Sequence, residues 1–150
     1  MRGAIAPLVV ALLAACTADD ETKPYVEFLG GGFVFNYRLA EADYGFVVKR
    51  VRRIPDGTLL EARFENPAGG EPLLVTQPAR WGRLEYVFRS PPVSGVEAGR
   101  DYRVELRLVE SASGRVLARY ARTYRADVGE DVLPPRPPVT GPGYQRSPAG

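Results

Sequence analysis

The chain has 150 residues, with 20 lysines and arginines against 18 aspartates and glutamates, no histidine and one cysteine. This length allows one ordinary domain with a sizeable core. The formal charge of +2 is too small to indicate a nucleic-acid partner. Histidine, the commonest general base and metal ligand, is missing. A single cysteine excludes internal disulfides and zinc sites built from several cysteines. The composition therefore favours a folded, non-catalytic module without a metal or cofactor.

The first residues are typical of a secretory signal. Arg2 supplies a positive start, and the ten residues 4–13 carry no charge. A segment of this length is too short to span a bilayer, which takes about 20 apolar residues. A short apolar stretch that ends in small residues is the form of a signal peptide. We therefore predict a signal peptide over residues 1–15.

The segment Leu13-Ala14-Ala15-Cys16 resembles the lipobox of bacterial lipoproteins, and Cys16 is the only cysteine of the chain. The resemblance implies that the signal is cut before Cys16 and that its thiol carries the acyl anchor, such as palmitate. A thiolate is the best nucleophile among side chains, and several acyl chains anchor a protein firmly. The alternative is an ordinary secretory signal in which Cys16 is incidental.

Residues 16–24 are expected to form the lipidated cysteine and a polar tether. Position 17 is Thr, whereas an Asp directly after the lipidated cysteine resembles an inner-membrane retention signal of enteric-type bacteria. The resemblance therefore favours the periplasmic side of the outer membrane. The run Asp19-Asp20-Glu21 lacks the loop spacing and turn glycine of a calcium site, so we interpret it as linker.

Between residues 25 and 128, apolar residues recur with a period of two, which indicates half-buried strands. The clearest core-facing positions are Phe33, Phe35, Tyr37 and Leu39; Leu60, Ala62 and Phe64; Leu84, Tyr86 and Phe88; and Tyr102, Val104, Leu106 and Leu108. Less regular strands are predicted over residues 25–29, 45–53, 72–76 and 115–125, and residues 39–44 allow one helical turn. Seven or eight short strands predict a single antiparallel, immunoglobulin-like β-sandwich, an all-β fold.

Glycine and proline punctuate these strands. Ile54-Pro55-Asp56-Gly57-Thr58 predicts a β-hairpin, because Pro presets the first turn position and Gly accepts a positive φ. Residues 66–70 and 111–114 predict two further loops. Gly30-Gly31-Gly32 precedes an alternating strand, whereas a phosphate-binding loop opens a helix. We interpret these glycines as a turn or as a close approach of two backbones.

Residues 96–104, VEAGRDYRV, resemble a loop and the start of the following strand in fibronectin type III domains. An apolar residue, a turn glycine and a tyrosine have this spacing there. The resemblance implies that Tyr102 is a tyrosine-corner residue whose hydroxyl bonds to nearby backbone. Trp81 departs from the immunoglobulin pattern because it precedes the strand at 84–88 instead of lying on an early core strand. Sandwiches of this kind host many functions, so the fold alone does not identify one.

A dense basic run supplies the candidate surface-binding residues, Lys49, Arg50, Arg52 and Arg53. Such a run could contact lipid headgroups, lipopolysaccharide phosphates or an acidic partner. Alternatively, Glu61 and Glu65 pair with it across the predicted hairpin. Exposed ion pairs are routine and worth under about 1 kcal/mol each. We favour this second interpretation, a solvated and salt-bridged sheet face.

The tail over residues 129–150 holds six of the 14 prolines, which favours extended polyproline II. It could dock on an aromatic groove of a partner, but we favour a disordered terminus. Trp81 and Tyr144 could be exposed anchors, although we favour a core or loop-packing position for Trp81.

These patterns predict a membrane-anchored periplasmic lipoprotein that acts as a non-catalytic interaction module or as an accessory subunit of an envelope assembly. Its expected partners are the membrane and an envelope protein. The alternative is a lipoprotein that binds an envelope glycan or lipid through an Arg-rich sheet face. An enzyme that uses carboxylates alone is a minor third option, because no His can activate a Ser and no GxSxG or SxxK motif occurs.

Overall fold

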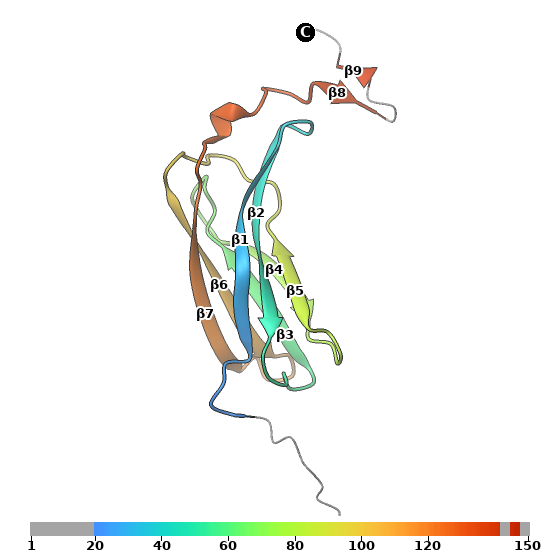
Figure 1. Ribbon diagram of the computed structural model, residues 1–150, viewed down its shortest axis with the longest axis vertical. Coiled ribbons are helices and arrows are strands. Elements are labelled where there is room, and N and C mark those ends of the chain that lie inside the picture. Colours follow the sequence, from blue (N-terminus) through green and yellow to red (C-terminus); the bar gives the residue numbers. More distant parts are fainter. Residues whose placement is uncertain (1–19, 142–144, 148–150) are drawn as a thin grey trace, which may run out of the picture.

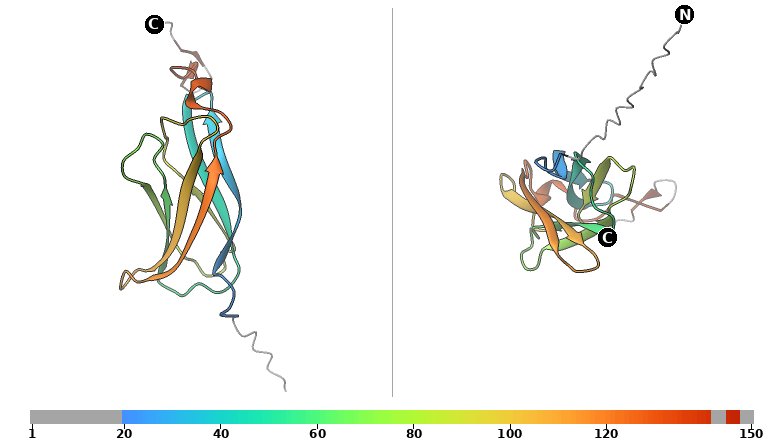
Figure 2. Two further views of the ribbon diagram at one scale, coloured as in Figure 1. Left: turned by 90° about the vertical axis from the view of Figure 1, so that its left-hand side faces the viewer. Right: turned by 90° about the horizontal axis from the view of Figure 1, so that it is seen from below.

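The computed structural model describes residues 20–141 and 145–147, which form two antiparallel sheets packed face to face (Figures 1 and 2). The strands are β1 (Val26–Asn36), β2 (Glu41–Arg50), β3 (Thr58–Phe64), β4 (Leu73–Pro78), β5 (Glu85–Arg89), β6 (Asp101–Glu110), β7 (Val116–Arg125), β8 (Val139–Thr140) and β9 (Gln145–Arg146). Sheet I has the order β1-β2-β5, and sheet II has the order β4-β3-β6-β7. The predicted all-β sandwich of immunoglobulin-like type is therefore confirmed.

The core lies between the two sheets and is built from the alternating apolar positions. Most of the predicted core residues are buried: Leu60, Ala62, Phe64, Tyr86, Phe88, Tyr102, Val104, Leu106 and Leu108. An aromatic cluster occupies its centre, where the ring of Tyr44 stacks on Phe33 with centroids 4.5 Å apart and meets Phe64 edge-on at 5.1 Å. Such pairs add about 0.5–1.5 kcal/mol each beyond the burial of their area.

Strand β1 runs through Gly30-Gly31-Gly32, where the sequence predicts a break between two strands. Of the three positions, Gly31 is the one where the surroundings leave no room for a side chain. A β-carbon at Gly31 would overlap the carbonyl oxygen of Gly45 and lie 2.5 Å from the ring of Tyr124. The interpretation as a close backbone approach is confirmed, and the interpretation as a turn is wrong.

The connection between β1 and β2 differs from the prediction in two ways. Tyr37 and Leu39 are exposed instead of lying in the core, because β1 ends at Asn36. The side-chain oxygen of Asn36 accepts a hydrogen bond from the backbone N–H of Leu39 at 3.1 Å, which closes a tight turn. The helical turn predicted over residues 39–44 is also wrong, since β2 begins at Glu41.

Residues 54–58, predicted to be a hairpin, carry the chain from one sheet to the other. β2 pairs with β1 and β5, whereas β3 pairs with β4 and β6. The turn chemistry is present, since Gly57 has a φ of 75° and the hydroxyl of Thr58 donates to the carbonyl of Pro55 at 2.7 Å. The hairpin prediction is wrong because turn residues set a local reversal and not the sheet that the next strand joins.

The two other predicted loops do connect hairpins. Residues 66–70 lie between β3 and β4, which pair with each other, and residues 111–114 lie between β6 and β7. At the open edge of the sandwich, β1 lies beside β7 (Figure 1). There the hydroxyl of Tyr120 accepts a hydrogen bond from the backbone N–H of Tyr25 at 2.9 Å, which ties the first residues of the domain to sheet II.

Different loops and chain segments lie at the two ends of the long axis of the sandwich. Residues 20–25 enter β1 at one end, and the segment after β7 leaves at the opposite end, beside the β1–β2 turn (Figure 1). We call the first the tether end and the second the far end. The β2–β3 connection, the β4–β5 connection and the β6–β7 turn all lie at the tether end, because the strands alternate in direction.

Candidate functional site

The outer face of sheet II is covered by ion pairs. Arg107 lies 3.7 Å from Glu61, and Glu105 contacts both Arg103, at 3.9 Å, and Arg119, at 3.4 Å. The side chains of Glu61 and Arg107 are only about one-fifth exposed (21% and 20%), so this pair is partly shielded from water. A solvated, salt-bridged sheet face is therefore present on sheet II, but the basic run for which it was predicted is not part of it.

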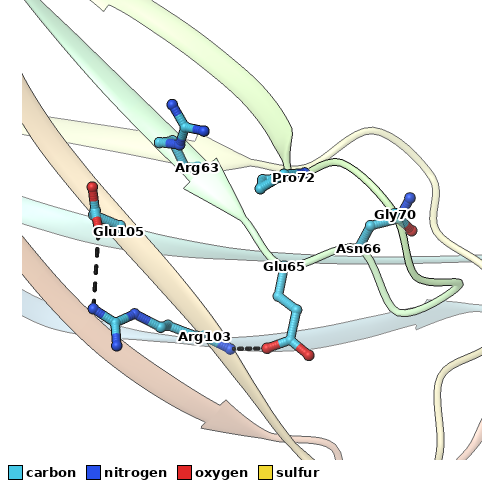
Figure 3. Close-up of a pocket in the computed structure, with 7 residues that line it drawn as sticks. All are labelled: Arg63, Glu65, Asn66, Gly70, Pro72, Arg103 and Glu105. Carbon is cyan, nitrogen blue, oxygen red and sulfur yellow. Dashed lines mark hydrogen bonds and ion pairs between the residues drawn. The ribbon is translucent and has the colours of Figure 1, made fainter.

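A shallow pocket of about 250 Å³ lies on this face (Figure 3). Its polar lining comes mainly from Arg63, Glu65, Arg103 and Glu105. The carboxylate of Glu65 accepts hydrogen bonds from the backbone N–H of Arg103 and from the guanidinium of Arg100, both at 2.9 Å. Each of the two carboxylates that line the pocket is thus engaged by arginine.

The outer face of sheet I has a different character. Gly32 of β1 lies opposite Gly45 of β2 on this face. Two exposed valines lie nearby, Val34 with 46% and Val87 with 56% of its surface exposed. Because the glycines bring no side chain, a hollow of about 240 Å³ opens between the valines. Apolar side chains around an open hollow, on a face that water would otherwise wet, indicate a contact surface.

A polar rim borders this hollow. The guanidinium of Arg89 donates to the carboxylate of Asp43 at 2.9 Å through Nε, and this hydrogen bond raises the pKa of the arginine. At the other side of the hollow, Lys49 lies in register with Glu27 and Glu85 on the neighbouring strands. Apolar centres with charged rims are typical of protein interfaces.

The predicted basic run does not form one surface. Lys49 belongs to the rim on sheet I, and Arg50 is the last residue of β2. The guanidinium of Arg52 stacks on the ring of Tyr25 at 3.8 Å and donates to the carbonyl of Glu21 at 2.8 Å. Lys49 is thus separate from the other three side chains, of which Arg50 and Arg53 line one pocket.

The acidic partners expected for this run are engaged elsewhere. Glu61 pairs with Arg107, and Glu65 pairs with Arg100 at 2.9 Å, because β3 lies in the sheet opposite to β2. Arg53 instead contacts Asp56, three residues further along the chain, at 3.4 Å. The predicted cross-strand pairing of the basic run with Glu61 and Glu65 is therefore wrong.

Trp81 is not in the core, and its predicted packing is wrong. Its side chain is 84% exposed in the β4–β5 connection, and Leu84, predicted to face the core, is 57% exposed before β5 begins. A pocket at the tether end is lined by Arg50 and Arg53 from one loop and by Arg80 and Trp81 from the other. The two loops are thus neighbours in space, which their separation in the sequence does not indicate.

Two buried tyrosines satisfy their hydroxyls with backbone groups. Tyr44 donates to the carbonyl of Glu65, and the hydroxyl of Tyr102 accepts from the backbone N–H of Glu97 at 2.8 Å. The second bond has the form that the tyrosine-corner resemblance implies. Burial, followed by the nearby charge of Glu65, raises the pKa of Tyr44 above its usual range.

The described part of the N-terminal segment forms a solvated turn. The carboxylate of Asp20 accepts hydrogen bonds from Thr22 and pairs with Lys23 at 3.6 Å, and the Thr22 bonds lower its pKa. Within residues 20–141 and 145–147, no three His, Cys, Asp or Glu side chains gather as metal ligands would. The same residues include no helix with the length and apolarity that crossing a membrane takes. Cys16 and Tyr144 lie outside the described residues.

The chain beyond β7 remains attached to the sandwich. The backbone N–H of Glu130 donates to the carbonyl of Val96 at 2.9 Å, and the carboxylate of Glu130 accepts from the N–H of Gly95. A short 3-10 helix (Glu130–Val132) follows, and β8 pairs with β9 further on. The described part of the Pro-rich segment thus has local structure in addition to extended backbone.

No family model matches the chain, and no curated protein sequence matches it either. Support for a function therefore comes from the chain's own residues and their arrangement.

Proposed function

We propose that this protein is a lipid-anchored lipoprotein on the periplasmic side of the bacterial outer membrane, and that its sandwich is a non-catalytic interaction module of an envelope assembly. One observation carries the proposal: the two outer faces of the sandwich differ. Sheet II is covered by ion pairs, whereas sheet I carries Val34 and Val87 beside an open hollow. A face kept apolar in this way favours contact with another protein.

The chemistry of sheet I defines the partner. The hollow of about 240 Å³ accepts one apolar side chain of an envelope protein, packed against the valines. The Asp43–Arg89 pair and Lys49 then exclude water at the rim and set the orientation of the partner. The charged face of sheet II supports solubility and discourages edge-to-edge association.

The anchor is supported by the sequence of the first 16 residues and by the place where the domain begins. Residues 20–25 approach the sandwich at the tether end (Figure 2), whereas the hollow lies on the outer face of sheet I, at the side of the sandwich. A partner anchored in the same membrane, or one that projects from it, reaches this side without being blocked by the tether. The arrangement therefore suits an accessory subunit.

The anchor is tested by Cys16→Ser, with Thr17→Ser as the matched control. We expect labelled palmitate to enter the natural chain and the control, and not the Cys16→Ser chain. Cys16 is the only cysteine, so no other thiol can take the label. Palmitate retained by Cys16→Ser would contradict the lipobox.

The interaction module is tested by placing a photo-crosslinking residue at Val87, with Thr76 as the matched control. Both positions are exposed on short outer strands, but Thr76 faces outward from sheet II, in register with Glu61. We expect Val87 to yield one recurrent protein adduct in fixed ratio in living cells, lost in the Val34→Asp background. Equal adducts from Thr76, or none from Val87, would overturn this assignment.

The ion pairs of the arginines bear on the alternative function, which is binding of an envelope glycan or lipid through an Arg-rich sheet face. On sheet II the arginines pair with glutamates, as in Arg107–Glu61 and Arg119–Glu105. Binding of an envelope glycan or lipid through that sheet face would have to break these pairs. We therefore favour the protein partner over the glycan or lipid ligand for the sheet surfaces.

A further inference from the structure

The tether end of the sandwich brings together two loops that are far apart in sequence. Residues 50–57 run from the last residue of β2 to the start of β3, and residues 79–84 connect β4 to β5, at the end where residues 20–25 enter β1 (Figure 1). Side chains of both loops line one pocket. The backbone N–H of Arg50 also donates to the carbonyl of Leu84 at 2.7 Å, which fixes the loops relative to each other.

The second loop exposes large apolar side chains at its tip. Trp81 is 84% exposed, the highest value among the large hydrophobic residues that the structure describes as exposed, and Leu84 is 57% exposed. Gly82, between them, has a φ of 83°, so the loop turns tightly and holds both side chains outward. Tryptophan is enriched where one part of the ring meets an apolar phase and its N–H meets water, as at a membrane surface.

The same loops are strongly basic. Together they hold five arginines, at positions 50, 52, 53, 80 and 83, against a single acid, Asp56. Within the described residues Arg50, Arg80 and Arg83 form no ion pair, and the Arg53–Asp56 pair is largely exposed. Positive charge that the domain leaves uncompensated beside an exposed indole indicates an anionic partner.

We propose that this tether-end patch, formed by Arg50, Arg53, Arg80, Trp81, Arg83 and Leu84, docks on the surface of an anionic phospholipid bilayer. Trp81 and Leu84 enter the interface, and the arginines bind lipid phosphates. Guanidinium matches phosphate in a bidentate geometry, and each basic side chain near an anionic surface contributes about 1 kcal/mol. Charge and apolar area act together, as in other surface-bound segments.

The position of the tether selects a bilayer as the occupant. Eight residues separate Cys16 from Tyr25, so a membrane that holds Cys16 lies within about 30 Å of the tether end. This part of the inference rests on the proposed lipid anchor. The anchor brings the patch to the membrane surface. Docking of the patch then orients the long axis of the sandwich away from the membrane, with the far end outermost.

Trp81 is the only tryptophan, so its fluorescence reports on the patch directly. The lipidated full chain is reconstituted into vesicles of phosphatidylethanolamine and phosphatidylglycerol, and in parallel into vesicles of phosphatidylcholine alone. We expect blue-shifted emission, and strong quenching by bromine atoms on the acyl chains, with the anionic vesicles. With phosphatidylcholine, or at high salt, the quenching falls severalfold.

A charge variant and its matched control test the role of the arginines. Arg80→Gln with Arg83→Gln should lose most of the quenching in anionic vesicles. Arg103→Gln with Arg119→Gln removes the same charge from the outer face of sheet II and should retain the quenching.

The two proposals fail in different ways. Protein that floats with the vesicles while Trp81 emits as it does in water overturns the docking and leaves the anchor intact. Protein that lacks acyl groups by mass and does not float contradicts the anchor. Equal quenching in both vesicle types, unaffected by the arginine variants, overturns the anionic-lipid assignment.

Discussion

The hydroxyl of Tyr102 and the backbone N–H of Glu97 are joined by a hydrogen bond of 2.8 Å. Tyr102 is fully buried in β6, and Glu97 lies in the loop that precedes this strand. The bond therefore fixes the loop against the core at the far end of the sandwich. The same loop binds the segment after β7 through the carbonyl of Val96, so one hydroxyl helps to hold two connections.

Replacing Tyr102 by Phe removes this acceptor and leaves the Glu97 N–H without its partner. We expect a loss of about 1–3 kcal/mol in the free energy of unfolding, since a polar group left unpaired in this partly buried position is costly. Urea unfolding of the two proteins measures it. Tyr37→Phe is the control, because Tyr37 is 62% exposed and should change stability by less than about 0.5 kcal/mol. Equal stabilities for all three proteins would argue against the role of this bond.

Gly31→Ala should destabilise the sandwich, whereas Gly30→Ala should not. The added β-carbon at Gly31 would overlap the Gly45 carbonyl and the Tyr124 ring, while nothing lies within 4 Å of one at Gly30. Overpacking of this kind costs about 1–3 kcal/mol. Thermal unfolding of both variants provides the comparison, and similar melting temperatures for the two would refute the close approach of β1 to β2 and β7.

Stability should decline at alkaline pH in a way that depends on Tyr44. Burial raises the pKa of Tyr44 in the folded protein above the value of 10.0 that it has when unfolded. Above pH 10 the unfolded chain therefore loses this proton while the folded chain keeps it, and the free energy of unfolding falls as pH rises. Tyr44→Phe removes the contribution. Denaturant unfolding between pH 9 and 11 should show a shallower decline for the variant, and parallel curves would contradict this account.

The ion pair of Glu61 and Arg107 should contribute more than the exposed pairs around it. Its side chains are 21% and 20% exposed, whereas those of Asp101 and Arg125 are 59% and 63% exposed. Neutralising one partner costs under about 1 kcal/mol for exposed pairs and about 3–5 kcal/mol for buried ones. Glu61→Gln should fall between these limits, at about 1–2 kcal/mol, with Asp101→Asn near zero. A chemical-denaturation series in which the order is reversed would count against it.

Local patterns predicted the strands well because their information is local. The alternation of Leu60, Ala62 and Phe64 identifies the buried face of β3 without knowledge of its neighbours. The partner of a strand is a long-range choice, and turn residues at 54–58 do not encode it. This is why the sequence predicts a β2–β3 hairpin, and with it the wrong partners for Glu61 and Glu65.

The candidate surfaces were harder to predict, for a related reason. Lys49, Arg50, Arg52 and Arg53 lie close together in sequence, but Lys49 faces outward from sheet I, whereas Arg50 and Arg53 line the pocket at the tether end. The large apolar side chain of Trp81 is of a kind that often lies in a core, but it is exposed in the β4–β5 connection. The hollow on sheet I depends on two glycines that meet across strands, which a single segment does not reveal.

The crossing from β2 to β3 also shapes the order in which the fold can assemble. β3 pairs with β4 close by in sequence, but its other edge is completed only by β6, which begins at Asp101. Until that strand arrives, a nascent chain presents an open β edge beside the apolar face of Phe64. Such non-local pairing slows folding to roughly milliseconds to seconds. During this time the charges of Glu61 and Arg63, on the other face of β3, discourage aggregation through the open edge.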